Sequence, residues 1–240
     1  MKNQYVGDVN DYRKYGLIRA LCGEDKDALR LGVLWLLTPD DKRNDGNILG
    51  YLDRPEQWRD YDQPLFDQLH SIVHKHYRRT VSLVQDINIL SGSSFAANLI
   101  PDDKITRNEI ISSAFKSFAG CDLIFFDPDN GLEVKSRPLG RKDSNKYLYY
   151  SETTDAFNRG HSLLIYQHFP RINRTEYISL RSIELIEATG ASNIFSFSTK
   201  FVCFFLVPQQ RHIPLFNQRI EIVREKWANQ FDINVHSAKA

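Results

Sequence analysis

Asp122-Leu-Ile-Phe-Phe-Asp127 is a short apolar run between two carboxylates, and it continues directly into Pro128-Asp129-Asn130-Gly131-Leu-Glu133. Such a run is typical of a strand that is buried on both faces, as in a parallel sheet. The residues after it suit a sharp turn, because proline fixes its own backbone and glycine lets the chain change direction. The sequence therefore predicts a strand that delivers Asp127 to one edge of a sheet.

Apolar strands and amphipathic helices alternate on both sides of this stretch. We expect helices at 11–22, 64–77, 106–118, 152–159, 174–189 and 215–227, followed by a polar tail. We expect strands at 31–37, 81–84, 95–99, 122–126, 161–166, 193–198 and 201–207. Alternation implies right-handed crossovers, whereas the close spacing of the last two strands indicates an antiparallel hairpin. The predicted fold is α/β and Rossmann-like: a mostly parallel seven-stranded sheet with a C-terminal antiparallel hairpin and helices on both faces.

Composition narrows the class of protein. The 240 residues are 42% apolar and 25% charged and contain no repeat or linker, so we expect one domain over 1–240. The charges of the 31 basic and 30 acidic residues nearly cancel, so the chain as a whole has no excess of positive charge that would attract nucleic acid. Three distant cysteines indicate reduced thiols, and the most apolar run, 201–207, is too short to cross a bilayer. We expect a cytoplasmic protein without a membrane partner.

Carboxylates gather after the central strand. Asp127, Asp129 and Glu133 could converge on a metal, a hydroxyl or an amine, and a plain turn is the alternative. His168 follows strand 161–166 at the same edge and could serve as a base or a stacking ring, although a lone histidine is more often structural. The candidate catalytic residues are Asp127, Asp129, Asn130 and His168.

Basic residues suggest a place for a substrate. The loop 135–146 is rich in lysine and arginine and ends in tyrosines, a pattern that suits phosphate contact and base stacking. A solvated loop is the alternative. Lys14 lies near the start of the first helix, which Asn10 or Asp11 could cap. The candidate substrate-binding residues are Lys14, Arg141, Lys142, Lys146 and Tyr147.

The loop after strand 31–37 is a third candidate. It contains Thr38-Pro39-Asp40-Asp41 and Asn44-Asp45-Gly46-Asn47, which could hold a ligand hydroxyl or a cation, or could simply be polar. The histidines His70, His74 and His76 follow no known zinc pattern and are interpreted as surface residues.

The layout resembles that of class I S-adenosylmethionine-dependent methyltransferases. Gly7, Asp11 and Lys14 match in spacing the glycine–aspartate–lysine signature of bacterial large-subunit ribosomal-RNA adenine-N6 methyltransferases, and Asp127-Pro128 matches the start of their aspartate-proline-proline-tyrosine motif. The third and fourth motif positions are Asp129 and Asn130 here. The opening 7–15 also resembles that of uncharacterised bacterial proteins.

The resemblance implies a methyltransferase that acts on nucleic acid or a nucleotide-like substrate, with Asp127 accepting a hydrogen bond from the target amine. It implies S-adenosylmethionine at the candidate cofactor residues Thr38, Asp40, Asp45, Gly46 and Asp127, although Gly46 is the only glycine where the family has a glycine-rich turn. Two alternatives stay open. One is a nuclease or phosphoesterase with Mg or Mn on Asp127, Asp129 and Glu133. The other is a non-catalytic binding protein that keeps the fold.

Overall fold

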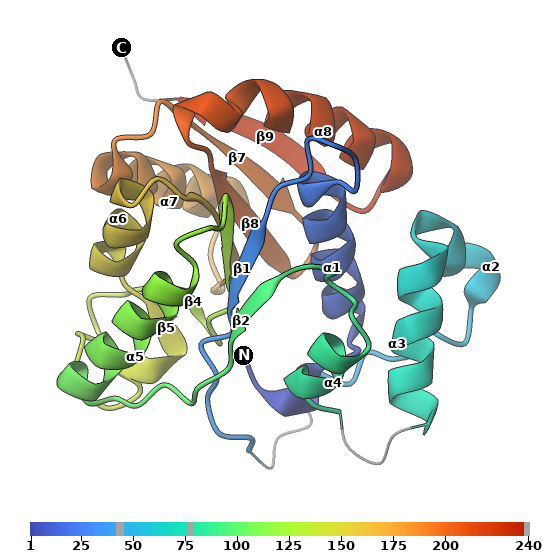
Figure 1. Cartoon of the computed structure of the whole chain (residues 1–240), viewed down its shortest axis with the longest axis horizontal. Helices are drawn as coiled ribbons and strands as arrows, with labels where there is room; N and C mark the ends of the chain where they lie inside the picture. The colour runs from blue at the N-terminus through green and yellow to red at the C-terminus, as the bar shows by residue number, and fades with distance from the viewer. Residues whose placement is uncertain (42–45, 76–78, 238–240) are drawn as a thin grey trace.

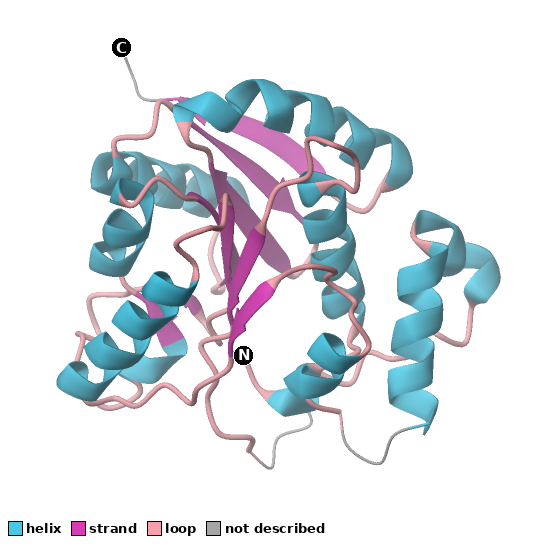
Figure 2. Cartoon of the chain, in the orientation of Figure 1, coloured by secondary structure: helices cyan, strands magenta, loops and turns pink. Residues whose placement is uncertain are grey.

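The computed structural model describes residues 1–41, 46–75 and 79–237. A mixed sheet runs through its centre in the order β2-β1-β3-β6-β8-β7-β9 (Figure 2). Its strands are β1 (Leu31–Leu34), β2 (Ser94–Ala96), β3 (Leu123–Phe126), β6 (Ser162–His168), β7 (Asn193–Ser198), β8 (Val202–Val207) and β9 (Asp232–Ser237). Two short strands, β4 (Gly131–Leu132) and β5 (Tyr147–Leu148), form a separate parallel pair.

The direction of the strands confirms the predicted fold class. The strands β2, β1, β3 and β6 are parallel, while β8 is antiparallel to both β6 and β7. The hairpin β7–β8 therefore inserts its second strand between β6 and β7. All residues of β1, β3 and β8 are buried, as expected for strands covered on both faces.

Helices cover both faces of the sheet (Figure 1). They are α1 (Val9–Cys22), α2 (Pro55–Trp58), α3 (Gln63–Lys75), α4 (Val81–Asp86), α5 (Lys104–Ser117), α6 (Tyr150–Asn158), α7 (Arg174–Thr189) and α8 (Ile213–Lys226). One core cluster joins α1, α3, α4 and α8 to the sheet, and a second joins α5, α6 and α7 to the opposite face. Of the helices in the described ranges, none has the length and apolar character needed to cross a membrane.

Two predicted segments were wrong. The segment 81–84 is not a strand but part of α4, where Val81 and Val84 lie one helical turn apart and are both buried. The predicted polar tail contains β9, which pairs with β7 along the edge of the sheet. No residue of β9 is fully buried, and its apolar alternation is limited to Ile233 and Val235, a pattern that the prediction of a polar tail left out. The prediction of a single domain stays a prediction.

The contact between α1 and α8 fixes the position of α1 beside the sheet. Gly16 of α1 lies against the indole of Trp227, directly after α8, and a Cβ atom added at Gly16 would overlap that ring. Tyr12, one turn earlier, packs on the same indole with ring centroids 5.0 Å apart. Close packing here places the first turns of α1 at the carboxyl ends of β1 and β3.

We predict that Gly16→Ala lowers the free energy of unfolding by about 1–3 kcal/mol, because the overlap with Trp227 outweighs the gain in helix propensity. The matched control is Gly50→Ala, where an added Cβ meets nothing within 4 Å. Urea unfolding of both variants gives the comparison. Equal stability of the two would contradict this account of the α1–α8 contact.

Candidate functional site

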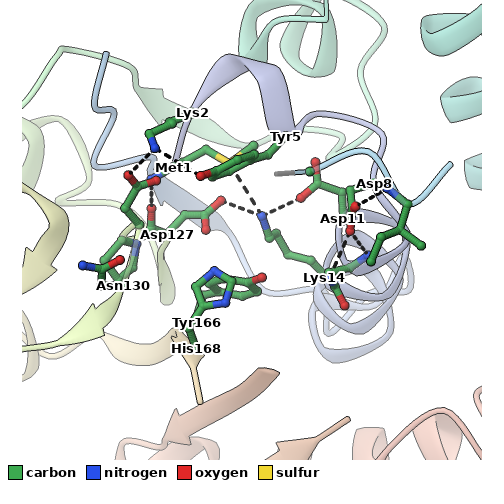
Figure 3. A pocket seen from close by; sticks show the side chains of 15 residues that line it. Met1, Lys2, Tyr5, Asp8, Asp11, Lys14, Asp127, Asn130, Tyr166 and His168 are labelled. Carbon is green, nitrogen blue, oxygen red and sulfur yellow. Dashed lines mark hydrogen bonds and ion pairs between the residues drawn. The ribbon is translucent and has the colours of Figure 1, made fainter. Parts of the chain in front are cut away.

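A pocket opens where the carboxyl ends of β3 and β6 meet α1 and the N-terminal segment (Figure 3). Its volume is about 340 Å³. We call it the carboxyl-edge pocket and define it by Met1, Lys14, Asp127, Asp129 and His168, with ten further lining residues. In α/β sheets ligands bind at this edge, because loops from neighbouring strands converge there.

Lys14 lies at the centre of the pocket wall (Figure 3). Its Nζ atom donates to Oδ1 of Asp11 at 2.7 Å and to Oδ2 of Asp127 at 2.8 Å. All three side chains are at least 96% buried. The ammonium also lies 4.7 Å from the ring centroid of Tyr166. Lys14 therefore ties α1 to the end of the central strand β3.

The charges of this ion triad, Asp11–Lys14–Asp127, follow from burial and pairing. Burial alone would lower the pKa of Lys14, but the carboxylates of Asp11 and Asp127 outweigh it, so the pKa is raised and the ammonium stays charged. Burial raises the pKa of Asp11 to about 6, although Lys14 opposes the change. At neutral pH Lys14 thus has two buried partners and no exposed surface with which to bind phosphate.

Asp129 is held by a second set of donors. The hydroxyl of Thr38 donates to its Oδ2 atom at 2.8 Å, and Nζ of Lys2 lies 3.4 Å from the same oxygen. The amino nitrogen of Met1 lies 3.3 Å from its Oδ1 atom. Burial opposes the charge, but Met1, Thr38 and Lys2 together hold the pKa of Asp129 below its usual range.

Backbone carbonyl groups complete this side of the pocket. The amino nitrogen of Met1 donates to the carbonyl oxygens of Asp127, at 2.8 Å, and Leu36, at 3.3 Å. Leu36 follows β1 and has a φ of +46°, which is strained for a branched side chain. The strained turn presents its carbonyl at the same place as that of Asp127, so this edge accepts an amino group.

His168 and Asn130 form the far wall. The ring of His168 meets that of Tyr166 edge-on with centroids 5.0 Å apart. Burial and the charge of Lys14 lower the pKa of His168 to about 4, so the imidazole is neutral at pH 7. Asn130 is held through its backbone, since Nε2 of Gln167 donates to its carbonyl oxygen at 3.0 Å.

The structure brings together all four residues predicted to be catalytic. Asp127, Asp129, Asn130 and His168 all line the carboxyl-edge pocket, as do Gly46 and Lys14. Thr38 does not line the pocket itself but donates a hydrogen bond to the pocket residue Asp129. The sequence did not indicate Met1, Lys2 or Tyr166, because no pattern links them to residues more than a hundred positions away.

Other predicted residues lie elsewhere. Asp40 is exposed and accepts a hydrogen bond from the backbone amide of Gln4. Asp45 and His76 lie outside the described residues. The substrate-binding candidates Arg141, Lys142, Lys146 and Tyr147 do not line the carboxyl-edge pocket. Of these, Arg141 and Lys142 are exposed, Lys146 pairs with Asp143 at 2.8 Å, and Tyr147 lies in β5.

The predicted metal group Asp127, Asp129 and Glu133 does not form. Gly131, with a φ of +106°, turns the chain away, and an Oε2 atom of Glu133 accepts from the backbone amide of Tyr150 at 3.2 Å. Across the described ranges, no three histidine, cysteine or acidic side chains are grouped so that they could hold a metal ion. The three carboxylates do not converge because the turn after Asp129 separates Glu133 from Asp127 and Asp129.

Comparisons with known proteins find similarity among solved structures alone, and one of the similar structures is described below. No family model matches the chain, and no curated protein matches it. The chain is similar to the crystal structure of protein LPL1258 from Legionella pneumophila str. Philadelphia 1, of family model DUF519. The identity is 12%, the match covers 99% of this chain and 97% of that one, and the TM-score is 0.38.

We predict that Lys14→Met lowers the free energy of unfolding at pH 7 by about 3–5 kcal/mol, because Asp11 and Asp127 are left buried without a counter-charge. The pKa of Asp11, which burial already raises, should then rise further, so the deficit should shrink as the pH falls through that raised pKa. Urea unfolding at pH 7 and pH 5 tests this. Lys116→Met on exposed α5 is the control, and equal losses in both variants would contradict the ion triad.

His168 should contribute to acid destabilisation. Its folded pKa of about 4 lies below the usual 6.5, so the unfolded chain binds more protons between these values and stability falls as the pH drops from 6.5 to 4. His168→Gln should lose less stability over this window, as measured by thermal unfolding at several pH values. An NMR titration that places the His168 pKa near 6.5 in the folded protein would refute this prediction.

Proposed function

We propose that the chain is an S-adenosylmethionine-dependent methyltransferase that acts on an amino group of a nucleotide-like or nucleic-acid substrate. The observation that carries the proposal is the position of Asp127, which ends the central strand β3 beside an open pocket. The sheet supports the proposal, because β8 is antiparallel and lies between β6 and β7. This arrangement resembles that of class I methyltransferases.

The pocket residues fit the amino-acid part of the cofactor. The carbonyl oxygens of Leu36 and Asp127 already accept an amino group, that of Met1. The thioether sulfur of Met1 lies 3.9 Å from Nζ of Lys14, so a methionine side chain is accommodated beside the ion triad. The amino group of Met1 thus occupies the place proposed for the amino group of the cofactor, and Met1 would have to withdraw for the cofactor to bind.

The charge of the pocket favours a cation. Four carboxylates, those of Asp8, Asp11, Asp127 and Asp129, line it, against Lys2, Lys14 and the amino group of Met1. The Oδ1 atom of Asn10 is a further acceptor, buried without a hydrogen-bond partner. A sulfonium ligand with an amino group supplies both the positive charge and the donors that this wall lacks.

The chain's own residues would align the acceptor. When bound, the cofactor supplies a methyl group on a positively charged sulfur. Asp127 would accept a hydrogen bond from the substrate amine, and Lys14 fixes the position of that carboxylate. His168, neutral at pH 7, has a ring nitrogen that can accept a proton nearby. Asn130 occupies the position at which the methyltransferase motif has an aromatic residue. The rings that line the pocket and could stack on a base are those of Tyr5, Tyr166 and His168.

Calorimetry with S-adenosylmethionine and S-adenosylhomocysteine tests the proposal. The wild-type protein should bind both, and Asp127→Asn should weaken binding at least about tenfold, since it alters the charge of the wall. Asp155→Asn on exposed α6 is the matched control and should leave binding unchanged.

Because Asp127→Asn also disturbs the ion triad, a second variant keeps the test independent of folding. Ile48 lines the pocket mouth and is 51% exposed, so Ile48→Arg adds a cation there without a change in the core. It should weaken binding of the positively charged S-adenosylmethionine more than that of S-adenosylhomocysteine. Absence of binding by the wild-type protein would contradict the proposal and favour a non-catalytic binding protein.

A further inference from the structure

A second cavity lies on the other side of His168 and Asn130 from the carboxyl-edge pocket, and both residues line the two cavities. Its volume is about 420 Å³, and its walls come from β4, β5, the end of β6 and α7. We call it the β6–α7 groove and define it by Leu132, Tyr147, Phe169, Ile172, Leu180 and Arg181.

The groove exposes apolar side chains to solvent. Ile172 is 56% exposed and Leu180 is 50% exposed, and both face the same cavity. Tyr147 adds an aromatic ring from β5, and Phe169 adds another from the end of β6. Exposed apolar side chains that gather in one concave place mark a binding site more often than scattered ones do.

Two arginines lie over the aromatic rings of the groove. The guanidinium of Arg174 lies 5.6 Å from the ring centroid of Phe169, and that of Arg181 lies 5.2 Å from the ring centroid of Tyr177. The two rings meet edge-on, with centroids 6.2 Å apart. Flat groups held beside cations suit a ligand that is both planar and anionic.

Arg181 is held in place in the wall of the groove. The residue is 91% buried, and its Nη1 atom donates to the carbonyl oxygen of Glu133, the hydroxyl of Tyr150 and the carboxylate of Glu184. Its Nε atom is buried and has no hydrogen-bond partner. The Nε atom is covered by protein atoms, so Arg181 contributes a fixed positive charge to the wall of the groove.

The rim of the groove is basic. Arg171 and Arg174 are exposed at the start of α7, and Lys135 is exposed after β4, next to the lining residue Val134. The acids nearby are Glu176, which is exposed, and Glu133 and Glu184, which are half-buried, and Glu184 is paired with Arg181. This local surplus of positive charge is compatible with the neutral balance of the whole chain, because it is confined to one rim.

We propose that the β6–α7 groove binds the base of a nucleotide, which stacks against Phe169 and Leu180 while Arg171 and Arg174 contact its phosphate. Stacking on flat side chains and phosphate contacts from arginine are the usual means of binding an unpaired base. This proposal places the substrate of the proposed function in the groove, and it rests on that function for the reaction. His168 and Asn130 would separate the held base from the carboxyl-edge pocket.

The experiment titrates the full chain, without S-adenosylmethionine, with adenosine monophosphate and with a fluorescent single-stranded RNA of about six nucleotides. Leu180→Asp and Arg174→Glu should each weaken binding roughly tenfold, since one removes the apolar wall and the other reverses a rim charge. Both side chains are exposed, so the fold should tolerate either change. The matched controls are Ile105→Asp, at a position 71% exposed on α5, and Arg224→Glu on α8.

Each outcome decides something. If adenosine monophosphate binds as tightly as the RNA, the ligand is a free nucleotide. If the RNA binds much more tightly, the ligand is a strand that makes several phosphate contacts. No binding of either by the wild-type protein, or equal weakening by the groove variants and their controls, overturns the inference. Because the cofactor is absent, nucleotide binding here together with failure to bind S-adenosylmethionine would sink only the proposed function.

Discussion

The ion triad of Lys14 with Asp11 and Asp127 is the interaction on which the rest of the site depends. Three buried charges are costly unless each is paired, and here one ammonium satisfies two carboxylates from different elements. The pairing fixes α1 against the end of β3 from one side, and the Gly16–Trp227 contact fixes it from the other. The edge of the sheet is thus charged but rigid.

That rigidity shapes two adjoining cavities with different chemistry. The carboxyl-edge pocket is acidic and holds an amino group on backbone carbonyls, which suits a cationic ligand. The β6–α7 groove is apolar with a basic rim, which suits a planar anion. His168 and Asn130 are the wall between them, and the low pKa of His168 keeps that wall uncharged at pH 7. Transfer of a group from one ligand to the other requires that the two binding sites lie next to each other, as these two cavities do.

The sequence predicted what depends on local pattern. The apolar run before Asp127 identified the central strand and its carboxyl end, and the spacing of Asp11 and Lys14 marked them as a pair of interest. The second partner of Lys14 was not predicted, because it is 113 residues away and no local pattern shows it. Glu133 was misplaced because the positive φ of Gly131 redirects the chain. The edge strand β9 was missed because its apolar alternation is limited to Ile233 and Val235 within a largely polar stretch.

NMR of the side-chain ammonium of Lys14, in protein labelled with ¹⁵N-lysine, tests the central claim most directly. At pH 7 we expect a slowly exchanging, protonated signal for Lys14, because the group is buried between two carboxylates. Addition of S-adenosylmethionine should shift that signal, since the ligand would replace Met1 beside it. A Lys14 ammonium that exchanges as fast as an exposed lysine, or one that does not respond to the ligand, would contradict the account.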